Sequence, residues 1–481
     1  MVARHGENPD PDYYLMFPGH RLEISDCLIV SLAETMYQKD GGTDIPVGYT
    51  YLGQFIAHDI THFIDPADKT LLKQLSAVER HNRRTPSLDL DSLYGHPSGF
   101  GSYIDSKDGK FVNKNQTEEK GRIVFFDLPR DEQGNALIGD GKNDENLFVA
   151  QMHLLFMSAH NRLYDLYSDQ GAKDPFKEAR KELTLIYQRI IQDDFLYRIL
   201  NHRVFEALFR KSGALYLLDI SPEDRVYMKL PHEFSAAAFR FGHSLVRSDY
   251  NIRFQGEILP QNIRQFFKLT GRGGEWEKIR PDQFSMAWDE QVDLSRYKVD
   301  NNYQEAEMID THFISEMLSL PMEPSGKNNI IARNLGRAME FGIGSGQSVI
   351  RAINSGQQGG EYCEQMGLEV LDFDKVKNND MQTLFDNFDL RSHMPLWTYV
   401  LIEPAQHFPS HIAHTRLGTL GSLLVGEVFR ALLLTSRTSL LDKGFDSSQS
   451  VFLRDIKSRF PERESNGDKI GLEDLVAFVH F

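Results

Sequence analysis

The feature that most constrains the fold of this chain is apolar periodicity of the helical kind. Residues 147–167 carry apolar side chains at recurring spacings of three and four, which places them on one face of a long α-helix. The same pattern recurs in 176–209, 339–353 and 422–434, whereas 124–126 is one of few strand candidates. The sequence therefore predicts a mainly α-helical protein with few short strands.

The domain organisation follows from an absence of clear boundaries. The 481-residue sequence shows no internal repeat and no linker rich in Pro, Gly or Ser, which predicts one large domain. We expect a catalytic domain over residues 50–440, preceded by an N-terminal extension at 1–49 that wraps the core. Residues 441–481 carry no recognisable motif, so the sequence predicts no role for this C-terminal segment.

Composition excludes several classes of function. The formal net charge of −16 argues against non-specific nucleic-acid binding. The two cysteines, Cys27 and Cys363, cannot build a disulfide framework, a zinc cluster or an iron–sulfur site. No apolar run approaches the ~20 residues of a membrane-spanning helix, and residues 1–8 lack the apolar core of a signal peptide. We therefore expect a cytoplasmic protein without a transmembrane segment, of undetermined oligomeric state.

The most informative motif is Gly-Gln-Phe-Ile-Ala-His-Asp-Ile-Thr at 53–61. On a helix, Gln54 and His58 are four residues apart and share a face, while Asp59 points to the side. A second histidine, His243, ends the motif Phe-Arg-Phe-Gly-His. Each histidine alone is more often a structural residue. Together, one beside an amide and the other beside an arginine, they suit the two faces of a haem.

An aspartate-rich segment at 85–95 predicts a calcium site. Its oxygen-bearing residues lie at alternate positions: Thr85, Ser87 (through its carbonyl), Asp89 and Asp91. Calcium takes six to eight oxygen ligands from flexible loops of this kind. Asp59 would complete the set and tie the segment to the helix of His58. The alternative interpretation is a turn with solvated carboxylates.

A third motif leads into the long helix. Lys142 precedes Glu145 by three residues, so both side chains can face one pocket. The alternative is an acidic helix start that complements the helix dipole.

A fourth motif can support the second histidine. Asn334 can accept a hydrogen bond from the free ring nitrogen of His243, a contact that fixes the tautomer of a metal ligand. Arg240 and Arg337 can pair with the carboxylates of a haem, because a guanidinium matches a carboxylate in a fork. Without the two histidines, ordinary surface ion pairs would be the simpler interpretation of these arginines.

In their order along the chain, these motifs resemble the animal-type haem peroxidase and cyclooxygenase superfamily, in particular its bacterial branch. The resemblance covers about residues 50–434. It rests on the residues at 53–61, on Asp-Leu-Asp-Ser-Leu-Tyr-Gly at 89–95, on His-Asn-Arg-Leu at 160–163 and on Phe-Arg-Phe-Gly-His at 239–243. It implies haem b bound between a distal and a proximal helix, with Ca²⁺ beside the distal helix.

The resemblance also assigns roles to residues. It makes His58 the distal acid–base residue with Gln54 as its neighbour, and His243 the proximal iron ligand with Asn334 behind it. The implied calcium shell is Asp59, Thr85, Ser87, Asp89 and Asp91. Glu145 falls where the family's glutamate forms an ester to a haem methyl. The implied function is a peroxidase that oxidises small organic molecules or halides with hydrogen peroxide.

Two departures from the family pattern bear on this chemistry. Lys142 stands in place of a distal arginine, and it carries the charge without the planar fork. Ala57 precedes His58, and we find no clear aspartate for a second ester link. In the oxygenase branch a radical-bearing tyrosine lies three residues before the proximal histidine, where this chain has Arg240. The alternatives are an oxygenase that uses O2 and an unsaturated fatty acid or specialised metabolite, with Lys142 holding a carboxylate, and a haem-binding protein without activity.

Overall fold

The computed structural model describes most of the chain. The described residues are 13–36, 42–61, 86–95, 103–105, 109–113, 115–119, 122–299, 302–320, 328–376, 379–407, 415–465, 467 and 469–481. Among the helices of this part, none combines the length and the apolar character needed to cross a lipid bilayer.

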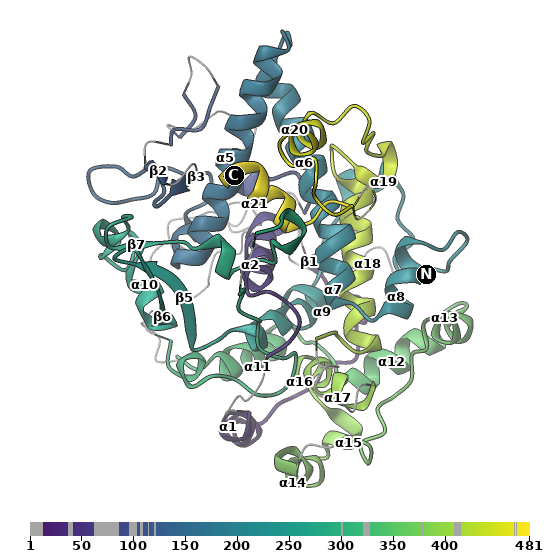
Figure 1. Ribbon diagram of the computed structural model, residues 1–481. Helices are drawn as coiled ribbons and strands as arrows, with labels where there is room; N and C mark the ends of the chain where they lie inside the picture. The colour runs from purple at the N-terminus through teal and green to yellow at the C-terminus, as the bar shows by residue number, and fades with distance from the viewer. Residues whose placement is uncertain are drawn as a thin grey trace, which may run out of the picture.

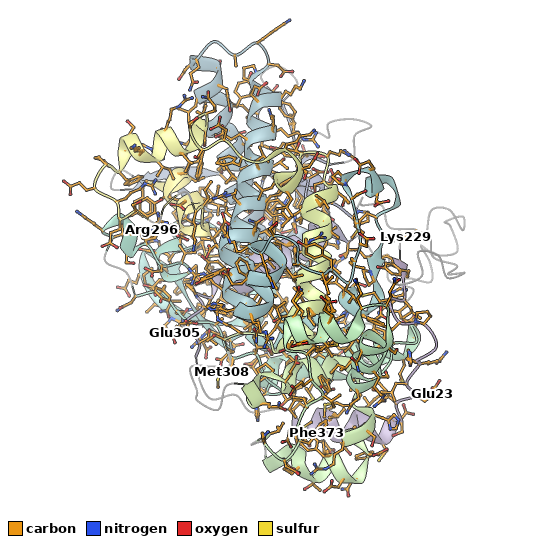
Figure 2. The ribbon with its side chains drawn as sticks, turned by 90° about the vertical axis from the view of Figure 1, so that its right-hand side faces the viewer. Glu23, Lys229, Arg296, Glu305, Met308 and Phe373 are labelled. Carbon is orange, nitrogen blue, oxygen red and sulfur yellow. The ribbon has the colours of Figure 1, made fainter. Side chains whose placement is uncertain are left out.

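Four helices form the centre of the molecule. They are α2 (Gly48–Ile60), α5 (Leu147–Asp169), α6 (Pro175–Ile190) and α18 (Thr419–Thr435). In Figure 1, α2 lies between α5 and α18, and α5 packs along α6 as an antiparallel pair. Side chains fill the space between these helices, as Figure 2 shows. The central helices therefore enclose one continuous hydrophobic core.

Shorter helices surround this centre. The remaining α-helices are α1 (Asp26–Thr35), α4 (Asp91–Tyr94), α7 (Leu196–Ile199), α8 (His202–Phe209), α9 (His232–Ser235), α10 (Ile263–Lys268), α11 (Ile330–Glu340), α12 (Gly346–Ser355), α13 (Gly359–Met366), α14 (Asn379–Asn387), α15 (Leu390–His393), α16 (Leu396–Ile402), α17 (Pro404–His407), α19 (Leu440–Lys443), α20 (Val451–Arg459) and α21 (Leu472–His480). The 3-10 helices are η2 (Gly141–Asp144), η4 (Pro222–Tyr227), η5 (Ala238–Leu245), η6 (Trp276–Lys278), η7 (Trp288–Glu290), η8 (Ser295–Tyr297) and η9 (Ser315–Leu318), while η3 (Ile191–Phe195) is a π-helix.

In the described part of the chain, the strands form three small sheets. β1 (Tyr13–Tyr14) pairs in parallel with β4 (Leu230–Pro231), and β2 (Gln116–Glu119) pairs antiparallel with β3 (Arg122–Phe125). The third sheet has the order β6-β5-β7 and is antiparallel: β5 (Asp249–Phe254), β6 (Glu257–Asn262) and β7 (Phe284–Ser285). Its register places Asp249 opposite Asn262. None of these sheets organises the core, which is helical.

Polar side chains fix the starts of the central helices. The side-chain oxygen of Asn146 accepts the N–H of Val149 at 3.0 Å and caps α5. Asp174 caps α6 in the same way, and Pro175 occupies the first helical position. The buried carboxylate of Glu403 accepts the N–H groups of the first turn of α18, and burial raises its pKa to about 7.

The structure confirms the mainly helical fold and the helices predicted at 147–167 and 422–434. The helical pattern predicted over 176–209 is confirmed, and the structure divides it into α6, the π-helix η3, α7 and α8, with an extended residue, Leu200, before α8. The helix predicted over 339–353 is wrong, because α11 ends at Glu340. Gly342 then adopts a φ of +68°, which favours glycine and ends the helix.

Both ends of the described chain pack against the central region. Near the start, the carboxylate of Glu233 accepts the N–H groups of Met16 and Phe17 at 2.9 and 3.0 Å. At the other end, α21 is buried and packs against α5. The predicted domain start at residue 50 lies inside α2, which begins at Gly48. The C-terminal segment contributes its last helix to the core.

Candidate active site

A cavity of about 570 Å³ contains both predicted histidines. His58 enters its wall from α2 and His243 from η5, which pack against each other. Much of the remaining wall is apolar: Leu245, Val246, Ile263, Phe266, Phe267 and Met317. A volume of this size and an apolar wall with a few polar groups are typical of small-molecule and cofactor sites.

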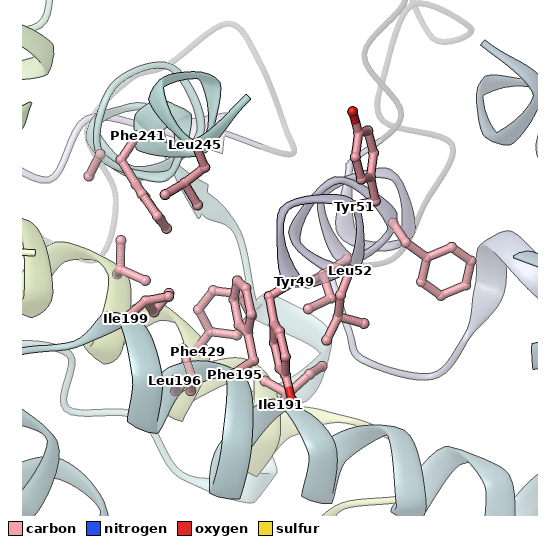
Figure 3. Packing of buried hydrophobic residues seen from close by; sticks show 14 of the residues in the cluster. Tyr49, Tyr51, Leu52, Ile191, Phe195, Leu196, Ile199, Phe241, Leu245 and Phe429 are labelled. Carbon is pink, nitrogen blue, oxygen red and sulfur yellow. The ribbon is translucent and has the colours of Figure 1, made fainter. Parts of the chain in front are cut away.

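Close packing positions the helix that carries His58. A Cβ atom added to Gly53 would lie 3.3 Å from Cζ of Phe195, so glycine permits the approach of α2 to η3. Figure 3 shows Tyr49 and Leu52 pointing from α2 toward Ile191 and Phe195, with Tyr51 directed away from them. The position of α2 therefore depends on its close packing against η3.

Tyr49 connects this helix to the C-terminal segment. Its hydroxyl donates to Oδ2 of Asp194 in η3 at 2.5 Å, and the same oxygen accepts the N–H of Leu472 at 3.0 Å. The guanidinium of Arg198 bonds the other oxygen of Asp194 and lies over the Tyr49 ring. Helix α21 thus helps to hold the wall of the cavity.

His58 is held by an asparagine that the sequence analysis did not single out. Nδ1 of His58 lies 2.8 Å from Oδ1 of Asn143, and Nδ2 of Asn143 lies 2.8 Å from Nδ1 of His153. Burial lowers the pKa of His58 below its usual value, an effect that nearby Lys142 reinforces and Glu145 opposes. The imidazole is therefore neutral, as a proton acceptor must be.

Gln54 is hydrogen-bonded through both ends of its amide. Its Nε2 donates to Oε1 of Glu145 at 2.5 Å, and its Oε1 accepts from Nδ2 of Asn146 at 3.1 Å. Gln54, Glu145 and Asn146 all line the cavity, as does His58. The structure thus brings Gln54 and Glu145 together beside His58, while their predicted roles remain predictions.

Lys142 also lines the cavity, and its ammonium group is hydrogen-bonded within the protein. Nζ donates to the backbone carbonyl of Thr61, the residue that ends α2. It also lies 3.8 Å from a carboxylate oxygen of Asp140. Lys142 therefore brings positive charge to the His58 side and ties η2 to the end of α2.

A buried ion cluster fixes the segment that carries Lys142 and Asn143. Arg130 forms a two-pronged contact with Asp144 at 2.7 and 2.9 Å, and a second one with Asp127. Asp144 also accepts the N–H of Gly271 at 3.0 Å. Bidentate guanidinium–carboxylate pairs impose a specific geometry, so η2 is held rigidly against the loop after α10.

On the opposite side, His243 lies in the 3-10 helix η5. Burial, then Arg240 and Arg333, lower the pKa of His243 to about 3, so its imidazole is neutral. Asn334 lies behind it as predicted, 3.0 Å from Nδ1. The predicted acceptor role of Asn334 is wrong, however: its oxygen accepts from Arg240 at 3.0 Å, so its nitrogen faces His243.

Three arginines gather on this side. Arg240 is partly buried, and the strongest charges that act on it, those of Arg337 and Arg333, have the same sign. Burial and this repulsion lower the pKa of Arg240 to about 10. Arg240 and Arg333 line the cavity, whereas Arg337 does not and pairs with Glu340 at 3.1 Å. The arginine of α11 that lines the cavity is therefore Arg333, one helical turn before the predicted Arg337.

The aspartates of the predicted calcium site are hydrogen-bonded to backbone N–H groups, and the site stays a prediction. The carboxylate of Asp59 accepts the N–H groups of Leu90 and Ser92, and that of Asp89 accepts those of Arg437 and Thr438. Within the described ranges, no three His, Cys, Asp or Glu residues are placed to hold a metal ion. The aspartates instead fasten the loop around Ser87 and Asp91 to α2 and to the turn after α18. Thr85 lies outside the described residues.

Sequence reasoning missed Asn143, His153, Asn146 and Arg333. Three of them lie directly beside predicted residues, since Asn143 follows Lys142, Asn146 follows Glu145 and Arg333 precedes Asn334. No local sequence pattern indicated a role for His153, because its contact with Asn143 joins two separate elements, α5 and η2.

The residues of the cavity fit a haem. His58 and His243 each present a neutral imidazole to the cavity. The positive charges of Arg240 and Arg333 attract carboxylates, such as the haem propionates. For His243 to bind iron through Nε2, its Nδ1 must carry the proton, which requires an acceptor behind it. In this structure Asn334 does not supply that acceptor, because its oxygen is bonded to Arg240; it would do so only if Arg240 paired with a haem carboxylate and the amide turned.

Comparison with known proteins supports this assignment. The family model described as animal haem peroxidase matches residues 64–433. Chorion peroxidase of Aedes aegypti is 25% identical over 277 residues, which cover 55% of this chain and 31% of the relative. Rat thyroid peroxidase is 31% identical over 114 residues, 23% of this chain and 12% of the relative. The chain thus spans less than a third of the length of these curated relatives.

Two solved structures share the fold. Peroxidase A of Dictyostelium discoideum has a TM-score of 0.58 at 16% identity and covers 98% of this chain and 92% of its own. Fatty acid alpha-dioxygenase of Arabidopsis thaliana has a TM-score of 0.59 at 15% identity, covering 93% and 77%. At such identities the likeness concerns the fold alone. Since the family model spans most of the chain, this protein belongs to the animal haem peroxidase family.

Proposed function

We propose that this protein is a haem-dependent peroxidase that oxidises small organic molecules or halides with hydrogen peroxide. One observation carries the proposal: two neutral, partly buried histidines from distant parts of the chain line one cavity, each hydrogen-bonded to an asparagine. Haem, when bound, supplies the iron at which peroxide is reduced. The chain supplies the groups that hold the haem, orient the peroxide and move its proton.

His58 is the acid–base residue of this proposal. Its free ring nitrogen takes a proton from one peroxide oxygen and returns it to the departing oxygen, which yields water. Lys142 supports the same step by placing positive charge where negative charge develops. Gln54, which Glu145 and Asn146 hold in place, lines the same space and orients the peroxide.

His243 binds the iron, and Arg240 with Arg333 receives the haem carboxylates. The proposal includes an ester bond between Glu145 and a haem methyl, and it is supported by the position of Glu145 in the cavity wall. That bond would replace a methyl C–H by a C–O bond, and one hydrogen peroxide would accept the two electrons and two protons and become water. Complete extraction of haem into acidified organic solvent after peroxide treatment would show that no ester forms.

The test is stopped-flow absorption of the haem-loaded protein mixed with hydrogen peroxide. We expect rapid conversion of the Soret band in the native protein. His58→Ala should bind haem normally and react about 10²- to 10⁴-fold more slowly, the usual contribution of a positioned acid–base group. Equal rates in the two proteins would overturn the proposal.

The cavity also favours a second candidate, an oxygenase that acts on an organic acid with O2. Among the described lining residues, the cations Lys142, Arg240, Arg272 and Arg333 face a single carboxylate, Glu145, in a chain whose net charge is −16. Two arginines suffice for the haem carboxylates, which leaves Lys142 and the exposed Arg272 for an anionic substrate. Oxygen uptake with unsaturated fatty acids, in the absence of peroxide, distinguishes this candidate from the first.

A further inference from the structure

His58, Asn143 and His153 form a hydrogen-bonded line that leads away from the cavity. His58 lies at its edge, Asn143 contacts Nδ1 of His58 at 2.8 Å, and His153 in α5 contacts the other end of the same amide at 2.8 Å. Asn143 and His153 have no exposed surface. Phe55, from the same helix as His58, packs against the ring of His153. Water therefore does not compete for these hydrogen bonds.

An amide between two ring nitrogens imposes opposite roles on them. The oxygen of Asn143 only accepts and its nitrogen only donates, so one histidine must donate to it and the other must accept. In the observed orientation Nδ1 of His58 donates to the oxygen, and Nδ1 of His153 accepts from the nitrogen. A neutral His58 with its proton on Nδ1 carries its lone pair on Nε2. Nε2 is the nitrogen left for a ligand in the cavity.

The opposite orientation of the amide would disable His58. Nδ1 would then accept from Asn143, and a neutral imidazole would carry its proton on Nε2, where it could not accept one from peroxide. When His153 carries its proton on Nε2, its Nδ1 can only accept, and this opposes the turned orientation, since two acceptors cannot bond each other. The charged groups that act on His58, namely Glu145, Lys142 and Asp140, shift its pKa but do not select the nitrogen that carries the proton.

We propose that Asn143 and His153 are positioning residues that fix the tautomer of His58, so that Nε2 is the proton-accepting nitrogen. This inference rests on the proposed peroxidase function and adds two residues to it. His153 acts indirectly: it orients the amide of Asn143, and that amide determines which ring nitrogen of His58 carries the proton. The device explains why a buried histidine lies on α5 with its ring nitrogen directed at an amide.

Two substitutions at Asn143 test the proposal in the haem-loaded full-length chain. Asn143→Asp keeps the shape and the acceptor and adds negative charge beside His58. We expect it to retain the peroxide reaction but to move the pH at which the reaction becomes half-maximal upward by about one unit or more. Asn143→Leu removes the acceptor, and we expect a peroxide reaction about 10- to 100-fold slower, with its pH profile moved downward.

His153→Leu tests the second residue by spectroscopy. In the ferrous carbonyl form, the C–O stretching frequency falls when a distal N–H donates to the bound ligand. The native protein should show a single band without such donation. His153→Leu frees the amide to turn and should add a band at lower frequency. As a matched control, Asn161→Leu also removes two side-chain hydrogen bonds, those to Phe111, and should leave the spectrum unchanged.

The outcomes separate this inference from the proposed function. If His58→Ala abolishes the peroxide reaction while both Asn143 variants keep the native rate and pH profile, the positioning role is wrong and the peroxidase assignment stands. Equal shifts of the pH profile in Asn143→Asp and Asn143→Leu would also overturn the inference, since they would indicate a general structural effect. An unchanged carbonyl spectrum in His153→Leu would remove His153 from it.

Discussion

The two histidines of the cavity each lie against an asparagine, but the two amides face them in opposite senses. Asn143 presents its oxygen to His58, because His153 occupies its nitrogen. Asn334 presents its nitrogen to His243, because Arg240 occupies its oxygen. His58 is therefore ready to accept a proton in the cavity, whereas a neutral His243 in this arrangement carries its proton on the cavity side.

The partner of each amide explains the difference. On the His58 side the partner is a buried imidazole, that of His153, which no ligand of the cavity replaces. On the His243 side it is a guanidinium among like charges, which an incoming carboxylate would attract. The hydrogen bonds around His58 are thus formed within the protein alone. Those around His243 would be completed only when the haem carboxylates bind. This contrast leads to four predictions.

The largest expected difference lies in haem retention. His243→Ala removes the iron ligand, and we expect haem to bind at least about 100-fold more weakly, since even indirect partners of a metal ligand cost 10- to 100-fold. His58→Ala should bind haem with nearly native affinity. Titration of the haem-free protein with haem, followed at the Soret band, measures both. Equal loss in the two variants would show that the two sides are not specialised in this way.

The three arginines near His243 should differ in their effect on haem affinity, according to whether they line the cavity. Arg240→Met removes a cation that faces the cavity and holds the Asn334 oxygen, so we expect haem affinity to fall by about 10- to 100-fold. Arg333→Met should reduce it less. Arg337→Met serves as the control, because Arg337 pairs with Glu340 away from the cavity. Haem titration of the three variants measures the order, and a loss in Arg337→Met as large as in Arg240→Met would restore the original assignment of Arg337.

The same contrast shows what the sequence could and could not predict. Gln54 and His58 are four residues apart on one helix, so their common face could be read directly, and the order of motifs indicated the fold. The amide contacts join separate elements, and their sense depends on third partners, Arg240 and His153, that no local pattern reveals. For the same reason the acceptor role predicted for Asn334 was chemically reasonable and still wrong.

The break between α11 and α12 is a different kind of error. Gly342 and Gly344 lie between the two helices, and Ser345 caps the second through the N–H of Ser348. These are ordinary signals for the end of one helix and the start of another. The apolar periodicity of 339–353 outweighed them in the prediction. Turn chemistry and periodicity must therefore be weighed together when an apolar pattern crosses glycines.

A smaller effect is expected in the stability of the haem-free protein at acid pH. The folded state holds His243 at a pKa of about 3, below its unfolded value near 6.5, so protons bind the unfolded chain more readily and stability falls as pH drops below about 6.5. This single group should cost about 1 kcal/mol between pH 7 and pH 5.5. His243→Leu should lose that part of the pH dependence. Urea unfolding of both proteins at the two pH values cancels the contributions of all other groups, and parallel changes would contradict the prediction.

The smallest expected effect concerns metal removal beside the helix of His58. Asp59 and Asp89 direct carboxylate oxygens at backbone N–H groups, a use that competes with coordination of a cation. We therefore expect dialysis against a calcium chelator to leave the melting temperature and the haem affinity unchanged. Asp59→Asn should still be destabilising, because an amide nitrogen cannot accept the N–H bonds of both Leu90 and Ser92. A fall in melting temperature on chelation, reversed by calcium, would show that Thr85 and these aspartates do converge on a metal ion.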